Sequence, residues 1–323
     1  MYSLREYFEF ARDIYEARGA YGVYRNGKAY LYETFLRQLG PVLDNEPEYV
    51  LEREWDVLII LDACRVDLLE EVSDEYEFLP EPPYDTIWSA GSYSEGWLRE
   101  NFTGTQARTY QEQMKTLAHI SGNPFTSELF EGDEFAVLDE VWEYGWDDEN
   151  GYIPPDVITD RAITYHRENM PQQMLVHYMQ PHSPFISDKN TGYHIDTNHF
   201  ASPTGAVSQR TPWELLRDGN ISQEECWEAY KDTLQVGLDS VEVLLNSIDA
   251  NRVIISADHG NAVGEWGVYG HPRNIPLAPL RQVPWVEVSA ENTEEYDPPE
   301  NPVLDSEQNE FNREEQLRDL GYV

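Results

Sequence analysis

The apolar run at 253–257 (VIISA) constrains the fold of this chain more than any other segment. An unbroken run of this length, rich in β-branched residues, is typical of a strand buried on both faces in a parallel sheet. The run leads into Asp258, His259 and Gly260, and ligands of open α/β sheets bind at the carboxyl ends of strands. A carboxylate beside an imidazole suits a divalent metal, and glycine allows a sharp turn into a loop. A strand can also end in these residues for structural reasons alone.

Similar apolar runs predict further strands, and amphipathic patterns predict helices between them. The expected strands are 56–61, 117–121, 134–138, 174–178, 253–257 and 284–288. The expected helices are 65–73, 94–101, 106–115, 155–169 and 222–248. Gly237 interrupts the last helix, at a cost of about 1 kcal/mol relative to alanine. The alternation predicts an α/β fold with a mainly parallel central sheet and helices on both faces.

Three parts of the chain differ in character. Residues 1–50 are expected to form a helical lead that docks on the body, and residues 51–290 the catalytic α/β domain. Residues 291–323 are expected to form an acidic linker followed by a short helix. Within the body, residues 183–211 have loop composition, and a long loop over such a sheet is often functional.

The charge balance of the 323-residue chain limits its partners. It has 61 acidic against 22 basic residues, a formal charge of −39, which argues against nucleic acid as a partner. Because 40% of its residues are hydrophobic, it can still bury a full core. An acidic, lysine-poor surface over a normal core resembles proteins of salt-loving microbes, where concentrated salt screens the self-repulsion. An acidic protein from an ordinary environment is the alternative.

The sequence also bears on the compartment. Cys64 and Cys226 lie far apart and indicate no disulfide framework, which fits a reducing cytoplasm. The first residues are charged throughout and offer no signal-peptide core, and no stretch approaches the ~20 apolar residues of a membrane span. We therefore expect a cytoplasmic protein without a membrane span.

Polar residues with chemical potential follow several expected elements. Asp62 leaves the first strand, where it can meet Asp258 and His259 at one sheet edge, or merely cap the next helix. Ser94 opens a helical run, and the positive potential there suits a nucleophile that attacks phosphate or sulfate. An N-cap is its structural alternative. His182 follows a strand, and His271 lies in a Gly/Pro loop, where a histidine is often a plain surface residue.

In this order, the segments resemble the alkaline phosphatase–sulfatase superfamily, specifically the sulfatase-like branch of haloarchaeal type. DACRVD (62–67) is similar to the branch's DDxRxD motif, and GSYSEGWLRENFTG (91–104) to its nucleophile, helix and closing FTG. HYMQPHSPF (177–185) resembles its H-x-P signature, and ISADHGNAVGEWGVYGHP (255–272) its DHG-x-x-x-G-E stretch. The last residues, QLRDLGYV, also resemble the end of such chains. The resemblance covers roughly residues 50–323.

Two departures from the branch stand out. Ala63 replaces the second aspartate of the motif, which removes one oxygen ligand. The formylglycine signal is absent, because Ser94 is followed by Glu-Gly-Trp-Leu, so Ser94 is expected to act as an unmodified hydroxyl on phosphate rather than sulfate esters. Trp97 is bulky where related enzymes often have small residues, which leaves the pocket shape open.

The resemblance implies a metal site, position by position. Its ligands are Asp62, Ser94, Asp258 and His259, a mixed oxygen and nitrogen set suited to one divalent ion, Mn²⁺, Mg²⁺ or Zn²⁺, and less to Ca²⁺. The same resemblance implies Ser94 as the catalytic nucleophile.

The other residues of the resemblance would serve the substrate. Arg65, His182 and His271 are expected to contact the substrate anion or the leaving group. A second metal is a further option, because His177 adds an imidazole to His182 and His271. The loop residues His194, Asp196 and His199 could also close such a site, although a solvated loop is the simpler interpretation.

The implied function is a metal-dependent hydrolase or transferase that acts on phosphate esters through a covalent Ser94 intermediate. A true sulfatase is one alternative. A non-catalytic sulfatase-like protein that binds a glycan or a partner is another, motivated by Ala63 and Trp97. The expected substrate is an anionic ester, such as a glycan or a lipid head group.

Overall fold

The computed structural model describes residues 27–40, 45–147, 151–186 and 211–299, together with Arg12 and Tyr24. The strands are β1 Val57–Leu61, β2 Thr86–Trp88, β3 Leu117–Ser121, β4 Val137–Glu140, β5 Gln173–Tyr178, β6 Ala250–Ser256, β7 Ala262–Val263, β8 Tyr269–Gly270 and β9 Gln282–Ala290. The helices are α3 Val66–Glu71, α4 Ser94–Phe102, α5 Gly104–Thr109, α6 Gln111–Met114, α7 Thr126–Leu129, α8 Pro155–Asn169, α9 Pro212–Arg217, α10 Gln223–Leu245 and α11 Ala278–Arg281.

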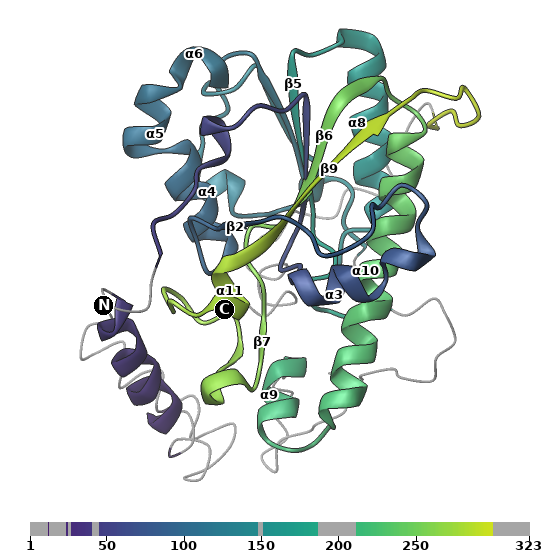
Figure 1. Ribbon diagram of the computed structural model, residues 1–323. Coiled ribbons are helices and arrows are strands. Elements are labelled where there is room, and N and C mark those ends of the chain that lie inside the picture. Colours follow the sequence, from purple (N-terminus) through teal and green to yellow (C-terminus); the bar gives the residue numbers. More distant parts are fainter. Residues whose placement is uncertain are drawn as a thin grey trace.

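The main sheet has seven strands in the order β2-β9-β6-β1-β5-β3-β4 (Figure 1). Strands β6, β1, β5, β3 and β4 are parallel, whereas β9 runs antiparallel to both β6 and β2. This confirms the predicted α/β class with a mainly parallel sheet. The central strand β1 is buried along its whole length, as expected for a strand with helices on both faces.

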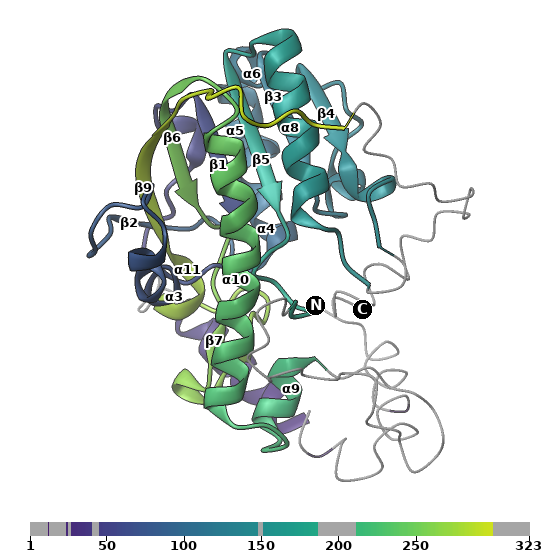
Figure 2. The same cartoon turned by 90° about the vertical axis from the view of Figure 1, so that its right-hand side faces the viewer.

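Alternate residues of β1 serve two different cores. Val57, Ile59 and Leu61 belong to the core that includes the apolar faces of α8 and α10. Leu58 and Ile60 belong to the core that includes α4. Figures 1 and 2 show α8 and α10 on one face of the sheet and α4, α5 and α6 on the other. Each such aliphatic side chain contributes about 1.5–3 kcal/mol when it is fully buried.

Helix α10 is the longest helix of the described residues and begins with a capping box. The Ser222 hydroxyl accepts a hydrogen bond from the Glu225 N–H (3.1 Å), and the Ser222 N–H donates to the Glu225 carboxylate (2.7 Å). The interior Gly237 has a packing reason, because a Cβ atom at this position would lie 3.0 Å from the Cβ of Gln180. The close approach of the chain at Gln180 explains a glycine that helix propensity alone disfavours.

The predicted elements differ from the observed ones in several places. Strand β4 begins at Val137, later than the expected 134–138, because the Glu134 carboxylate accepts from the Gly132 N–H (3.0 Å) and holds a turn there. The expected helix 106–115 is divided at Tyr110, whose backbone leaves the helical region, into α5 and α6. The sequence missed the three-residue strand β2, which pairs with β9, and the short helix α9.

The helical residues 27–38 lie against the body of the protein. Leu36 is buried in a small core with Val268 and Ile275, and the Arg37 Nε donates to the Arg273 carbonyl oxygen (2.7 Å). Residues 291–299 contain neither helix nor strand, and the predicted C-terminal helix lies outside the described residues. The division into three parts stays a prediction. No helix within the described ranges has the length and apolar character needed to cross a bilayer.

Candidate metal and nucleophile site

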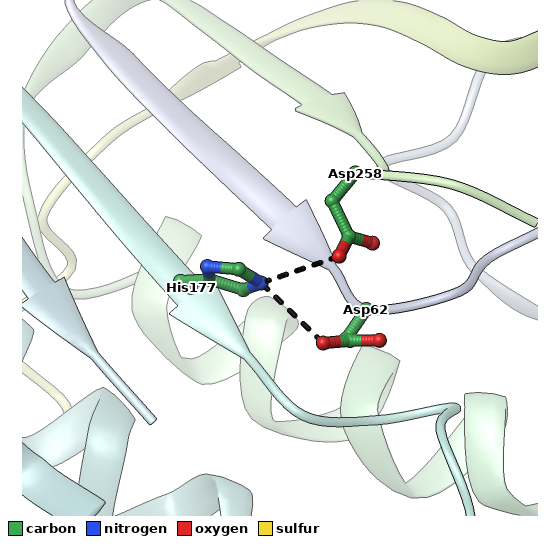
Figure 3. Close-up of side chains that lie close together, drawn as sticks. All are labelled: Asp62, His177 and Asp258. Carbon is green, nitrogen blue, oxygen red and sulfur yellow. Dashed lines mark ion pairs between the residues drawn. The ribbon is translucent and has the colours of Figure 1, made fainter. Parts of the chain in front are cut away.

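Two carboxylates and one imidazole meet at the carboxyl ends of the central strands. Asp62 directly follows β1, His177 lies in β5, and Asp258 follows β6 (Figure 3). The His177 Nε2 lies 3.7 Å from Asp62 Oδ2 and 4.0 Å from Asp258 Oδ2. All three side chains are fully buried. This buried group could hold a metal ion.

The two oxygens of Asp62 have different surroundings. Oδ2 accepts hydrogen bonds from the Ser94 hydroxyl (2.9 Å) and from the Asn123 side-chain amide (2.9 Å). Oδ1 has no hydrogen-bond partner among the described residues. Two donors therefore fix the carboxylate while one buried oxygen stays available to a ligand.

Asp258 shows the same division. Its Oδ1 accepts from the main-chain N–H groups of Ala63 (2.9 Å) and His259 (2.8 Å). Its Oδ2 has no hydrogen-bond partner in the part of the chain that the structure describes. A buried carboxylate oxygen without a donor is costly, so its retention points to a cation as the missing partner.

His259 lies beside both available oxygens. Its Nδ1 must carry the ring hydrogen, because it donates to the Gly260 carbonyl oxygen (3.0 Å), and the Nε2 lone pair then points into the site. Nε2 lies 3.6 Å from Asp62 Oδ1 and 3.5 Å from Asp258 Oδ2. Two ligands of one tetrahedral ion lie roughly 3.4 Å apart. The donor set therefore fits a divalent ion.

The backbone around His259 explains the glycine that follows. A Cβ atom at Gly260 would lie 2.3 Å from the Pro279 carbonyl oxygen, and the Gly260 N–H donates to the Leu280 carbonyl oxygen (3.0 Å). Glycine is thus required by close packing against the segment at 279–280.

The charge state of the site follows from burial and from the surrounding imidazoles. Burial favours the protonated acid, but His177 and the neighbouring imidazoles hold the pKa of Asp62 below its ordinary value. Burial and the charge of Asp62 together raise the pKa of Asp258. A bound cation would offset the repulsion between the two carboxylates.

Ser94 is the first residue of α4, and Tyr93 is the N-cap of that helix. The Ser94 hydroxyl donates to Asp62 and lies 3.3 Å from the Nε2 of His259. The geometry therefore does not support the alternative that Ser94 is the N-cap of the helix. Ser94 is fully buried among groups that can accept its proton.

The structure also places a pair of imidazoles next to His259. The ring centroids of His259 and His271 lie 4.5 Å apart, and the Nε2 atoms of His182 and His271 lie 2.9 Å apart. Burial lowers the pKa of both His182 and His271, so both rings are neutral near pH 7. The Nδ1 of His182 donates to the Ser183 carbonyl oxygen (2.5 Å), so the hydrogen between the rings belongs to His271.

Arg65 points elsewhere. Its guanidinium donates twice to Asp67 (2.8 and 2.6 Å), and to the Glu265 carboxylate and the Asn261 carbonyl oxygen (2.7 Å each). It lines a cavity together with Trp227 rather than the group around Asp62. These bonds join the turn after β1 to the turn after β6. Substrate binding by Arg65 stays a prediction.

Sequence reasoning missed two contributions to the site. Asn123, which orients Asp62, follows β3, so the rule that polar residues at strand ends converge would have found it. His177 was considered only as a ligand of a second metal. Trp97 is buried in the core, and its ring packs edge-on against the ring of His177, with 5.7 Å between the centroids. It therefore supports the position of His177. The loop residues at 194, 196 and 199 lie outside the described residues.

Comparisons with known proteins give structural neighbours only. No family model and no curated protein matches the sequence. The soluble domain of lipooligosaccharide phosphoethanolamine transferase A from Neisseria meningitidis is similar at 13% identity and a TM-score of 0.46, over 77% of this chain and 80% of that chain.

Two further neighbours have other descriptions. A putative sulfatase from Bacteroides thetaiotaomicron is similar at 11% identity and a TM-score of 0.43, over 78% of this chain and 67% of that chain. A protein in the alkaline phosphatase superfamily from Vibrio parahaemolyticus is similar at 12% identity and a TM-score of 0.40, over 82% of this chain and 70% of that chain.

Proposed function

We propose that this chain is a metal-dependent hydrolase or transferase of phosphate esters with Ser94 as the nucleophile. The observation that carries the proposal is the placement of the buried Ser94 hydroxyl 2.9 Å from Asp62 and 3.3 Å from His259. A serine hydroxyl becomes an effective nucleophile when a neighbouring base can take its proton. The site has this arrangement at the edge of the sheet where ligands of α/β folds bind.

The proposed metal ligands are Asp62, Asp258, His259 and Ser94, with His177 beside the two carboxylates. Bound there, a divalent ion such as Mn²⁺, Mg²⁺ or Zn²⁺ would polarise a phosphoryl oxygen and lower the pKa of the serine hydroxyl. The support for this set is the pair of carboxylate oxygens that lack donors, both within 3.6 Å of the His259 Nε2. A second metal held by His182 and His271 stays an option.

The proposed reaction begins with attack of the Ser94 Oγ on phosphorus. The Oγ–P bond forms as the bond from phosphorus to the leaving oxygen breaks, and the proton that Ser94 loses, which starts in a hydrogen bond to Asp62, ends on the leaving oxygen. The neutral His182–His271 pair would contact the leaving group without protonating it. Water or an acceptor alcohol then takes the phosphoryl group from Ser94.

Phosphate is preferred to sulfate because Ser94 lacks the residues that direct its oxidation to formylglycine. A true sulfatase stays the main alternative. The non-catalytic alternative loses part of its motivation, because Trp97 is part of the core and does not fill a substrate pocket. We expect a polar anionic ester as substrate, such as a glycan or a lipid head group.

The direct test measures release of p-nitrophenol from phosphate monoesters, phosphate diesters and sulfate esters, with Mn²⁺, Mg²⁺ or Zn²⁺ in concentrated salt. Ser94→Ala should reduce phosphate-ester cleavage at least about 10³-fold, as expected for loss of a nucleophile. Ser73→Ala is the matched control, because this buried serine donates to the Glu70 carbonyl oxygen (2.8 Å) and is not one of the proposed site residues.

Three results would count against the proposal. The wild-type protein and Ser94→Ala could be equally inactive on all esters and metals. Sulfate esters alone could be cleaved, with a Ser94 peptide two hydrogens lighter than serine, which would indicate a sulfatase. The Ser94 peptide could also carry no phosphoryl group after rapid acid quenching of a reacting sample.

A further inference from the structure

Ala63 has an unusual backbone conformation at the centre of the site. Its φ of 65° lies in the left-handed region, which residues with a Cβ atom rarely adopt. In this conformation its N–H points to Asp258 Oδ1 (2.9 Å), and its carbonyl oxygen accepts a hydrogen bond from the Tyr230 hydroxyl. The residue that replaces an expected aspartate thus contacts the site through its backbone.

Tyr230 contacts the turn at Ala63 through its side-chain hydroxyl. It lies in α10 and is fully buried, and its ring packs edge-on against Trp213 (5.4 Å) and Trp227 (6.0 Å). The Asn261 side-chain amide donates to the Tyr230 oxygen (3.4 Å), so the hydroxyl hydrogen is directed to Ala63. The aromatic packing fixes the position of the hydroxyl, and the hydroxyl fixes the turn.

The consequence appears at Asp258. Its Oδ1 is occupied by two main-chain N–H groups, from Ala63 and from His259. If the Ala63 backbone left this conformation and its N–H turned away, Oδ1 would lose one of its two donors and the carboxylate could turn. The orientation that leaves Oδ2 beside the His259 Nε2 (3.5 Å) therefore depends on the Ala63 conformation.

We propose that Tyr230 is a positioning residue for the metal site, acting through the backbone of Ala63 on Asp258. The inference rests on the proposed metal ligands, but the link from the Tyr230 hydroxyl through the Ala63 backbone to the Asp258 carboxylate exists without an ion. Tyr230 is fully buried and is not one of the proposed metal ligands. It couples the long helix α10 to the turn after β1, and that turn to the carboxylate after β6.

A tyrosine that only packs in the core and one that positions the metal site predict different effects of removing the hydroxyl on Ala63 amide protection and on Mn²⁺ affinity. Tyr230→Phe keeps the ring packing and removes only the hydroxyl. Tyr76→Phe is the matched control, because the buried Tyr76 hydroxyl also reaches α10, where it lies 2.9 Å from the Gln235 carbonyl oxygen and 2.7 Å from Asp239. Both variants lose one buried hydroxyl, and only one of these hydroxyls contacts Ala63.

The first measurement is amide hydrogen exchange at Ala63 in metal-free, selectively ¹⁵N-alanine-labelled protein. Tyr230→Phe should lower the protection of this amide at least about tenfold, and Tyr76→Phe should leave it unchanged. Equal protection in the wild type and Tyr230→Phe would overturn the link. This measurement stands whether or not the protein binds metal.

The second measurement is Mn²⁺ affinity by calorimetry. Tyr230→Phe should weaken binding about 10–100-fold, the range for partners that orient metal ligands, and Tyr76→Phe should bind like the wild type. Adding Ala63→Gly to Tyr230→Phe should restore part of the affinity, because glycine adopts positive φ without steric cost.

The outcomes separate this inference from the proposed function. Lower Ala63 protection with unchanged Mn²⁺ affinity would overturn the role of Tyr230 in the site. A wild-type protein that binds no Mn²⁺ would contradict the proposed metal site, while the loss of Ala63 protection in Tyr230→Phe would still support the link.

Discussion

Strand β1 has an aspartate at each end, and the two are in opposite situations. Asp56 precedes the strand and is only partly buried. Its Oδ2 accepts a hydrogen bond from the main-chain N–H of Arg252 (2.9 Å). The surrounding charges at this end are exposed and paired, as in the contact of Arg252 with Glu54 (2.9 Å). Asp62 follows the strand, is fully buried, and retains an oxygen with no donor among the described residues.

The comparison shows that position in the fold, and not residue type, decides what a carboxylate does here. At the amino end of the strand, solvent and the main-chain N–H of Arg252 satisfy the Asp56 carboxylate at little cost. At the carboxyl end, two carboxylates are buried, and one oxygen of each has no hydrogen-bond partner among the described residues. In the proposed function, a bound cation would offset the free-energy cost of this arrangement.

The largest expected difference between the two aspartates is in metal binding. Asp62→Asn keeps the shape of the side chain but removes a charged ligand, so Mn²⁺ affinity should fall more than about 100-fold, beyond the effect of losing an orienting partner. Calorimetry on protein treated with chelator measures this. Asp56→Asn is the control and should bind Mn²⁺ like the wild type. Equal weakening in both variants would show that the two ends are not functionally distinct.

An effect of intermediate size, on stability, is expected at Arg65. This residue lies at the same end of β1 as Asp62, but its guanidinium is bonded to Asp67, Glu265 and the Asn261 carbonyl oxygen. Arg65→Met should lower the free energy of unfolding by about 2–3 kcal/mol, because it leaves Asp67 and Glu265 without their partner. The exposure of Asp67 keeps the effect below that of a fully buried pair. Urea unfolding measures it. Unchanged stability together with a much higher KM would instead support substrate binding by Arg65.

The smallest expected effect concerns the metal-free protein and its pH dependence. Asp258→Asn retains an oxygen for the N–H groups of Ala63 and His259 but removes a buried charge, so it should stabilise the metal-free protein by about 1–2 kcal/mol near pH 7. Because the folded-state pKa of Asp258 is raised, its protonated form favours folding at low pH. That contribution is lost as pH rises from about 4 through the folded-state pKa.

Urea midpoints measured between about pH 4 and pH 8 test this prediction. The variant should show a smaller loss of stability with rising pH than the wild type. Asp62 acts in the opposite direction, because its lowered pKa gives a contribution that is lost only as pH falls. Asp56→Asn should change stability by less than about 0.5 kcal/mol. A wild-type stability that rises with pH as steeply as that of Asp258→Asn would contradict the raised pKa of Asp258.

The sequence predicted the fold class and the meeting of the strand ends, since both follow from short-range patterns. Unbroken apolar runs define β1 and β6, and the rule for strand ends brings Asp62 and Asp258 together. Strand β2 was missed because three residues show no period, and helix α9 because it directly follows the long stretch of loop composition at 183–211. The start of β4 was misplaced because a side-chain hydrogen bond from Gly132 to Glu134 outweighs the apolar pattern.

The finer features of the site depend on contacts between residues far apart in the chain. No pattern near Ala63 reveals its left-handed backbone, which is held by a residue 167 positions later. The direction of Arg65 is likewise set by Glu265, which lies 200 positions away. Residue types at motif positions were therefore readable, whereas their orientations required the folded chain.

Gly237 has a consequence for protein engineering. An interior glycine in a long helix is a common target for stabilisation, because alanine there gains about 1 kcal/mol in helix propensity. In α10 the added methyl group would press on Gln180, which lies two residues before His182. A substitution chosen to stiffen a remote helix would thus displace the segment that leads to the imidazole pair, and a thermostabilised variant should keep this glycine.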